Sequence, residues 1–390
     1  MSNDQDSIKT RTVRAALETD TQHGAVVPPI HLTSTFAFGG YGEKREYDYS
    51  RSGNPTREAL GRALAELEGG EGAVVTASGM GAVSLVTQFF RPEQVVVVPH
   101  DCYGGTYRLF NALEARGALQ VRFVDYQDAA ALESALASKP AMVWIETPSN
   151  PLLRIVDIAA VASRAKAAGA LVAADNTFLS PVWQRPLALG ADLVVHSTTK
   201  YLNGHSDVVG GVVIAATPEL HQQAKWWGNC IGVTGAPFDS FLTLRGLRTL
   251  HARMRAHGEN ALRLAELLAG HPAVAKVYYP GLSTHPGHAI ARRQQQGFGA
   301  MLSFELAGSL VNVKALLANL RLFSLAESLG GVESLVAHPA SMTHAAMDEV
   351  ARTRAGISPT LVRLSVGIED GDDLAHDLAA GLDAAMREVA

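Results

Sequence analysis

Lys200 occupies a position where lysine is uncommon. It ends the stretch HSTTK (196–200), directly after the apolar run LVV at residues 193–195, which is typical of a buried strand. Lysine side chains normally extend into water, so one held at the rim of a core is either paired with an acid or kept as a nucleophilic amine. A structural ion pair and a Schiff-base lysine are therefore both open interpretations of Lys200.

Asp175 closes a second apolar run, LVAAD, at residues 171–175. A carboxylate at the end of a buried strand is costly unless a cation, a metal or hydrogen bonds stabilise it. Its side chain therefore either pairs with a positive group or caps the segment that follows it.

The stretch SGMGA, which contains Gly79 and Met80, separates the run AVVT from a helical pattern. A small-residue turn between strand and helix directs free backbone N–H groups at a phosphate, although it can equally be a tight turn that packs a helix on a sheet. A dinucleotide fingerprint needs a third glycine at position 84, which is Ser84, and the chain has no Gly-Lys dipeptide. The sequence thus excludes a P-loop and disfavours a nicotinamide dinucleotide site.

These three features match the needs of one cofactor. A turn for a phosphate, an aspartate for a protonated pyridine nitrogen and a lysine for an aldehyde are what pyridoxal phosphate requires. Tyr103, in the loop DCYGG, can stack on a flat pyridine ring, and Ser197 and Thr199 can donate hydroxyl groups to the phosphate. A nicotinamide oxidoreductase and a non-catalytic scaffold protein are rival classes, but neither gives Lys200 a use.

The apolar runs alternate with helical patterns from about residue 60 to about residue 250. Continuous apolar strands separated by helices predict an α/β domain with a mostly parallel sheet, whose ligands bind beyond the carboxyl ends of the strands. The later order of helix, two strands, helix and strand predicts a smaller α+β domain. We expect an N-terminal arm (1–60), a large cofactor domain (61–250) and a C-terminal domain (251–390). The six runs are AVVT (73–76), VVVV (95–98), MVWIE (142–146), LVAAD (171–175), LVVH (193–196) and GVVIA (211–215).

Composition and charge narrow the classes of partner. The 390 residues carry a formal net charge of −5, with 47% hydrophobic and 18% charged residues, and no basic patch indicates nucleic acid. No apolar run approaches the roughly 18 residues needed to span a bilayer, so we expect a cytoplasmic protein without a membrane partner. Cys102 and Cys230 form no CxxC arrangement, which argues against a disulfide framework or a zinc site, and we expect no bound metal.

Ordered motifs along the whole chain resemble those of a known family. The chain is similar, over nearly all its length, to the Cys/Met-metabolism family of pyridoxal-phosphate enzymes of fold type I. The resemblance implies the aspartate aminotransferase-like transferase fold and pyridoxal 5'-phosphate as the cofactor. The motifs that carry it are YSRSGNPTR, SGMGA, DCYGGTYR, SNPLLRIVDI, DNTFLSP, HSTTKYLNGHSDVVGG, LRGLRTL and LAESLGGVESL.

The resemblance also implies which residues hold the cofactor. Lys200 would be the Schiff-base lysine, Asp175 the partner of the pyridine nitrogen, and Tyr103 the ring that stacks on the cofactor and assists proton transfer. Two of the implied residues would reach the phosphate from a neighbouring subunit, so the site would be complete only in an oligomer. The resemblance itself implies a homotetramer built from catalytic dimers. The residues implied for the phosphate are Gly79, Met80, Ser197 and Thr199 of one subunit, with Tyr49 and Arg51 of its neighbour.

Small amino acids would be the substrates of such an enzyme. Arg363, in the motif LVRLSVG, would hold the substrate α-carboxylate as a bidentate fork, with Asn150 beside it. Ser328 would orient the lysine or the carboxylate. The residues implied for the rest of the substrate are Glu327, Arg108 and Asp48.

The expected activity depends on a few positions around the substrate. The closest resemblance is to the bacterial γ-synthases, which join a succinyl or acetyl ester of homoserine to cysteine and give cystathionine for methionine biosynthesis. Glu327 is shared with the γ-lyases, whereas β-lyases carry an aromatic near that position and methionine γ-lyases a cysteine in place of Gly105. Enteric γ-synthases have arginine in place of Ser52, so recognition of a succinyl group would fall on Arg108. The γ-lyase reaction, which gives cysteine, 2-oxobutyrate and ammonia, is the alternative.

Overall fold

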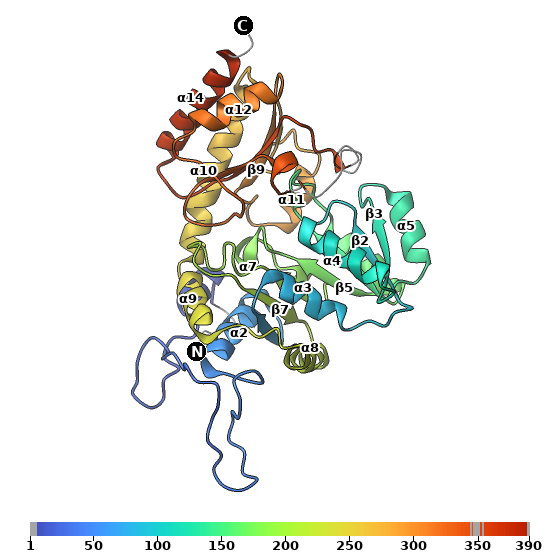
Figure 1. Ribbon diagram of the computed structural model, residues 1–390, viewed down its shortest axis with the longest axis vertical. Coiled ribbons are helices and arrows are strands. Elements are labelled where there is room, and N and C mark those ends of the chain that lie inside the picture. Colours follow the sequence, from blue (N-terminus) through green and yellow to red (C-terminus); the bar gives the residue numbers. More distant parts are fainter. Residues whose placement is uncertain (1–5, 344, 346–351, 353–354, 388–390) are drawn as a thin grey trace.

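The computed structural model describes residues 6–343, 345, 352 and 355–387. Two β-sheets organise this part of the chain, each covered by helices (Figure 1). The larger sheet lies in the lower half of Figure 1 with α3, α4 and α8, and the smaller sheet lies in the upper half with α10, α12 and α14. None of the described helices is both long and apolar enough to cross a membrane.

Seven strands form the larger sheet, and most of them are parallel. Only β7 runs antiparallel to its neighbours β1 and β6. The sequence analysis missed one edge strand, β3, because its residues alternate between exposed and buried instead of forming a continuous apolar run. In sheet order the strands are β1 (Gly72–Thr76), β7 (Gly211–Ala215), β6 (Leu193–His196), β5 (Leu171–Asp175), β4 (Met142–Glu146), β2 (Val95–Pro99) and β3 (Gln120–Val124).

Helices cover both faces of the larger sheet. The longest of them at the N-terminal end, α2, begins where Asn54 caps the first turn through its side chain, and it ends at Gly69, whose φ of 80° is left-handed. The helices of this part are α2 (Pro55–Glu68), α3 (Gly79–Thr87), α4 (Gly104–Ala115), α5 (Ala129–Ala137), α6 (Ile158–Ala167), α7 (Ser180–Trp183), η1 (Pro186–Leu189), α8 (Pro218–Ile231) and α9 (Pro237–Leu247).

Five strands form the smaller sheet. All its neighbouring pairs are antiparallel except β10 with β11. In sheet order the strands are β10 (Ser324–Leu325), β11 (Leu335–Ala337), β12 (Leu361–Ser365), β9 (Met301–Leu306) and β8 (Val274–Tyr278). The accompanying helices are α10 (Leu250–Gly270), α11 (His288–Gln294), α12 (Leu310–Asn319), η2 (Pro339–Ser341) and α14 (Gly371–Arg387).

One hydrophobic core runs from the larger sheet into the smaller one. Leu60 and Val194, near the larger sheet, belong to the same buried cluster as Phe304 and Leu364 of the smaller sheet. The mostly parallel α/β architecture with a smaller α+β part is therefore confirmed. The limits of the predicted domains, 1–60, 61–250 and 251–390, stay predictions.

The N-terminal segment before α2 has little regular structure. It contains the short helix α1 (Ile8–Val13), after which only isolated bridges such as Thr35 with Tyr49 occur before α2. Figure 1 shows this segment extending away from the body of the molecule, and several of its apolar side chains, such as Leu32 and Tyr41, are exposed.

Substitution of Gly211 tests the close approach between β7 and the start of α3. A Cβ at this position would lie 2.2 Å from the backbone carbonyl oxygen of Ser78, so Gly211→Ala forces the backbone before α3 to move. We expect the free energy of unfolding, measured by urea titration, to fall by about 1–3 kcal/mol. Gly270→Ala is the matched control, because a Cβ there meets nothing within 4 Å. Equal stability of the two variants would contradict the packing described.

Candidate functional site

Lys200 follows β6 and turns toward the smaller sheet. Its amine donates a hydrogen bond to the hydroxyl of Ser328, with 2.8 Å between Nζ and Oγ. Burial, with a further contribution from the cation of Arg363, lowers the pKa of Lys200 to about 8, and the Glu327 carboxylate opposes this effect. The partner of Lys200 is thus a neutral hydroxyl, and the ion pair with Asp175 that the sequence left open is absent among the described contacts.

Arg363 lies within β12 and is buried beside Lys200. It donates to Asn150 Oδ1 at 2.9 Å and to the carbonyl oxygen of Ser328 at 3.0 Å, while its buried Nε has no hydrogen-bond partner. Burial lowers the pKa of Arg363 to about 10. No described carboxylate forms an ion pair with it, so this guanidinium has the features of a receptor for a ligand's carboxylate.

Ser328 connects Lys200 to Arg363 through both its side chain and its backbone. Its φ of 101° lies outside the usual regions for a residue with a side chain, and such conformations cost about 1–3 kcal/mol each. The strained backbone allows the hydroxyl to accept from Lys200 while the carbonyl accepts from Arg363. Strain of this kind concentrates at functional sites.

Asp175 ends β5 at the carboxyl edge of the larger sheet. Its Oδ1 accepts from the backbone N–H of Thr177 at 2.9 Å, which is the local capping contact considered from the sequence. Burial raises the pKa of Asp175, whereas the Thr177 hydrogen bonds and the nearby His196 oppose the shift. An incoming positive group would therefore gain strongly by pairing with this carboxyl group.

The start of α3 packs directly on the lysine loop. Ser78 Oγ accepts from Gly81 N at 3.0 Å, which leaves the N–H groups of Gly79 and Met80 at the helix terminus. A Cβ on Gly79 would lie 2.8 Å from Ser197 Cβ, so only glycine permits this approach. A helix terminus with glycine beside serine is suited to a phosphate.

The Thr199 hydroxyl is engaged within its own loop. It donates to the carbonyl oxygen of Gly210 at 3.2 Å and accepts from Gly210 N at 3.0 Å. The backbone N–H of Ser197 donates to Thr177 Oγ1 at 2.9 Å, which ties the loops after β5 and β6 together. These contacts hold Ser197 and Thr199 close to the terminus of α3.

Tyr103 lies at the end of the loop after β2, and its side chain is half exposed. Its backbone N–H donates to Glu146 Oε2 at 2.9 Å. A Cβ on Gly105 would come within 2.5 Å of the Tyr103 ring and 2.8 Å of the sulfur of Met80, so the ring rests against Gly105 and Met80. This packing leaves a ring face available beside the terminus of α3.

The predicted residues Arg108 and Glu327 lie at the outer edge of the site. Arg108 is exposed on the first turns of α4, and its Nη1 would lie 3.8 Å from a Cβ on Gly104. Glu327 is also exposed and acts on both Lys200 and Arg363 through its charge.

The structure does not bring Asp48, Tyr49 and Arg51 to Lys200 of the same chain. The Arg51 guanidinium lies 5.8 Å from the ring centroid of Tyr49, and Asp48 accepts from Ser52 Oγ at 2.7 Å and pairs with Lys44 at 2.9 Å. Contribution of these residues to a neighbouring subunit stays a prediction.

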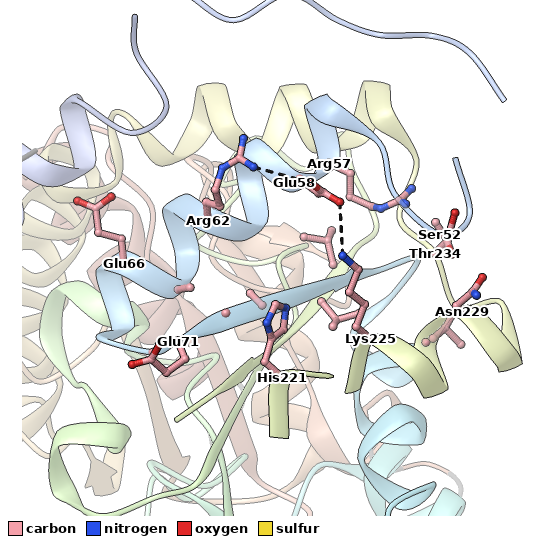
Figure 2. A pocket seen from close by; sticks show the side chains of 18 of the residues that line it. Ser52, Arg57, Glu58, Arg62, Glu66, Glu71, His221, Lys225, Asn229 and Thr234 are labelled. Atoms are coloured by element: carbon pink, nitrogen blue, oxygen red, sulfur yellow. Dashed lines mark ion pairs between the residues drawn. The ribbon is translucent and has the colours of Figure 1, made fainter. Parts of the chain in front are cut away.

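A cavity of about 650 Å³ lies between α2, β1 and α8, and Figure 2 shows its polar lining. Arg51 and Ser52 belong to its rim, and Glu58 pairs there with Arg62 and Lys225. Neither Lys200 nor Arg363 lines this cavity, so it is separate from the cluster of predicted catalytic groups.

Sequence reasoning missed two buried acids near the site. Glu146 ends β4 in the same way as Asp175 ends β5, and the run MVWIE gave the same signal as LVAAD. Glu68, within α2, is hydrogen-bonded to the ring of His196, with 2.6 Å between Oε1 and Nε2, and both side chains are almost fully buried. Glu68 lies within a helix and does not end an apolar run, and its partner His196 is 128 residues away, so no local pattern marked it.

The residues present fit pyridoxal phosphate. Four groups follow the carboxyl ends of strands of the larger sheet. They are the N-terminus of α3, the half-exposed ring of Tyr103, the buried carboxyl group of Asp175 and the amine of Lys200. Among the described residues, no group of three or more His, Cys, Asp or Glu side chains is arranged to hold a metal ion.

Comparisons with known proteins show the family of this chain. The family model described as "Cys/Met metabolism PLP-dependent enzyme" matches residues 9–383. Cystathionine gamma-synthase of Escherichia coli is 59% identical over 379 residues, which are 97% of this chain and 98% of that protein. Cystathionine gamma-lyase of Dictyostelium discoideum is 47% identical over 377 residues, 96% of this chain and 97% of that protein, and cystathionine beta-lyases match as well.

A solved structure is also closely similar. The crystal structure of cystathionine gamma synthase from Xanthomonas oryzae pv. oryzae in complex with cystathionine has a TM-score of 0.97 and 61% sequence identity, and the match covers 98% of this chain and 99% of that chain. The predicted fold class and the predicted cofactor are thereby confirmed.

The pKa of Lys200 can be tested by chemical labelling of the cofactor-free protein. Burial destabilises the ammonium form, so the neutral, nucleophilic amine should appear with a midpoint near pH 8, well below about 10.4 for an ordinary lysine. The pH dependence of trinitrophenylation is followed by mass spectrometry of the Lys200 peptide, with the exposed Lys9 peptide as the reference for reagent activity. Arg363→Met removes a neighbouring cation and should move the midpoint upward. A midpoint of about 10 or above in the unmodified protein would contradict the prediction.

Proposed function

We propose that this chain, which belongs to the Cys/Met metabolism family of pyridoxal-phosphate-dependent enzymes, makes cystathionine by γ-replacement. Its substrates would be an O-succinyl or O-acetyl ester of homoserine and cysteine. The sulfur of cysteine bonds to the γ-carbon of the homoserine unit, and succinate or acetate leaves. The likeness to cystathionine gamma-synthases of two bacteria supports this choice.

One observation carries the proposal, namely that Ser328 joins a reactive amine to a buried guanidinium. Lys200 and Arg363 lie beside each other without a carboxylate between them, which suits a substrate that presents an amino group and a carboxylate on the same carbon. Arg363 and Asn150 would hold the α-carboxylate, and Lys200 would then face the α-carbon. Because the α-carbon and Lys200 would be held close together, the proton transfer between them would occur within one complex, without a further bimolecular encounter.

Each residue then has a role toward the cofactor. When bound, the cofactor supplies an aldehyde and an electron-withdrawing ring. Lys200 would hold the cofactor through its aldehyde, and its amine, of lowered pKa, would carry the proton that leaves the substrate α-carbon. Asp175 would pair with the protonated ring nitrogen, and Tyr103 would cover one ring face. The phosphate would be held by Gly79, Met80, Ser197 and Thr199, with Tyr49 and Arg51 from a neighbouring subunit.

The distal end of the substrate determines the choice of reaction. Arg108 is exposed and free to meet a succinyl carboxylate, and Glu327 and Asp48 would line the same end. Ser52 donates to Asp48 and supplies no second cation. That observation favours a second candidate, the γ-lyase reaction on cystathionine, and a cystathionine gamma-lyase is among the relatives.

A homotetramer of catalytic dimers is part of the proposal. The extended N-terminal segment carries exposed apolar side chains, Leu32 and Tyr41 among them, which an isolated chain would leave in water. Seated on a second copy, this segment would bring Tyr49 and Arg51 to the neighbouring phosphate site.

A paired assay distinguishes the two candidate reactions. One arm supplies O-succinylhomoserine or O-acetylhomoserine with cysteine and measures cystathionine, and the other supplies cystathionine alone and measures 2-oxobutyrate. We expect kcat/KM for O-succinylhomoserine to exceed kcat/KM for cystathionine, because Arg108 provides a cation for the free carboxylate of the succinyl group. Lys200→Ala is the inactive control for both arms. A larger kcat/KM for release of 2-oxobutyrate would establish the lyase instead.

Removal of the charge of Asp175 tests its pairing with the ring nitrogen. Asp175→Asn keeps the size of the side chain but loses the anion, so turnover should fall about a hundredfold or more. Asp192→Asn is the matched control, because Asp192 accepts from Val172 N near the opposite end of β5. Steady-state kinetics with saturating pyridoxal phosphate measures the effect. Unchanged turnover of Asp175→Asn would exclude the proposed pairing.

A further inference from the structure

Glu146 and Asp175 form a pair of carboxyl groups at the carboxyl edge of the larger sheet. They end the parallel strands β4 and β5 and stand directly opposite each other in register. Neighbouring strands lie about 4.8 Å apart, and paired residues project from the same face. Trp144 and Ala173 lie two residues before Glu146 and Asp175, are paired with each other, and so project from the same face of the sheet. Both belong to one buried cluster with residues of α3 and α4, so this is the face that α3 and α4 cover.

No cation neutralises this pair among the described contacts. The ion pairs of the described residues include neither Glu146 nor Asp175. The titratable groups around them are Asp101 and Cys102 of the loop after β2, Tyr126 after β3, and His196 of β6. Two buried like charges without a counter-ion cannot both persist, so the pair retains a proton.

The hydrogen bonds determine which member of the pair keeps that proton. Asp175 is stabilised as an anion by the N–H and the side chain of Thr177 and by His196, which itself contacts Glu68. Within the part of the chain that the structure describes, Glu146 accepts one hydrogen bond, from Tyr103 N. Consistent with this asymmetry, burial and the neighbouring Asp175 raise the pKa of Glu146 well above its ordinary value.

We propose that Glu146 is a positioning residue that holds the proton of this carboxyl pair, leaves Asp175 ionised, and fixes Tyr103 through its backbone N–H. The inference rests on the proposed function in one respect, namely that the cofactor ring lies between Tyr103 and Asp175. Glu146 then serves both contacts of the ring at once. It anchors Tyr103, which covers the ring face. As a neutral acid, it adds no second negative charge beside the carboxylate of Asp175.

The test compares Glu146→Ala with Glu146→Gln in the cofactor-loaded enzyme. Glutamine has the shape and neutral charge of the protonated acid and keeps an acceptor for Tyr103 N, whereas alanine leaves that N–H without a partner. We expect Glu146→Ala to weaken equilibrium binding of pyridoxal phosphate about tenfold or more and to change the visible circular dichroism of the bound cofactor. Glu146→Gln should restore most of the affinity, the circular dichroism and the pH profile of the cofactor absorbance.

A second measurement does not depend on the stability of the alanine variant. A buried protonated carboxyl group gives its own infrared band, which should be present in the unmodified protein and missing in Glu146→Gln. Absence of that band, or a Glu146→Gln variant that binds cofactor as poorly as Glu146→Ala, would overturn the proposed protonation. Unchanged binding and circular dichroism in Glu146→Ala would overturn the positioning role.

The two proposals can fail separately. If Asp175→Asn keeps full turnover and cofactor affinity, the placement of the ring beside Asp175 is wrong, whatever Glu146 does. If Asp175→Asn is impaired while the Glu146 variants give the contradictory results above, the proposed function stands and only the inference about Glu146 falls.

Discussion

Burial of two cations beside each other is the constraint on which this site depends. Lys200 and Arg363 share Ser328 as their hydrogen-bond partner, and their mutual repulsion contributes to the lowered pKa of the lysine. Such an arrangement is costly in an apolar interior unless a ligand supplies negative charge. The protein thereby keeps an amine partly neutral near pH 8 and a guanidinium that has neutral hydrogen-bond partners and a free Nε but no counter-ion among the described residues.

The two sheets hold these cations in place from opposite sides. Lys200 belongs to the loop after β6 of the larger sheet, while Arg363 lies within β12 of the smaller one. Arg253 of α10 fixes the lysine loop, because it donates to the carbonyl oxygens of Tyr201 at 2.8 Å and Gly246 at 2.9 Å. One hydrophobic core continues between the two sheets and fixes the strands that carry these cations relative to each other.

The sequence predicted most strands that end at the site, because buried strands of a parallel sheet are continuous apolar runs. It missed β3, whose residues alternate at the sheet edge. It did not foresee that β7 is antiparallel, because β7 is as buried and as continuously apolar as the parallel strands. The positions of Lys200 and Asp175 followed from the residues that end each run. The contact between Ser328 and Lys200 spans 128 residues and the pair of Glu68 with His196 also spans 128, and no local pattern encodes such contacts.

Charge is distributed unevenly across the site, and this arrangement orients whatever binds there. The acids Asp175 and Glu146 end adjacent strands on one face of the larger sheet, whereas the cations Lys200 and Arg363 meet at the junction with the smaller sheet. The charges that act on the pKa of Lys200 are those of Arg363 and Glu327. Asp175 and Glu146 therefore do not raise the pKa of this lysine. A ligand with a positive ring nitrogen at one end and a carboxylate at the other gains electrostatic energy in one orientation only. Because the groups are held by strand ends and buried hydrogen bonds, that preference exists before the ligand arrives.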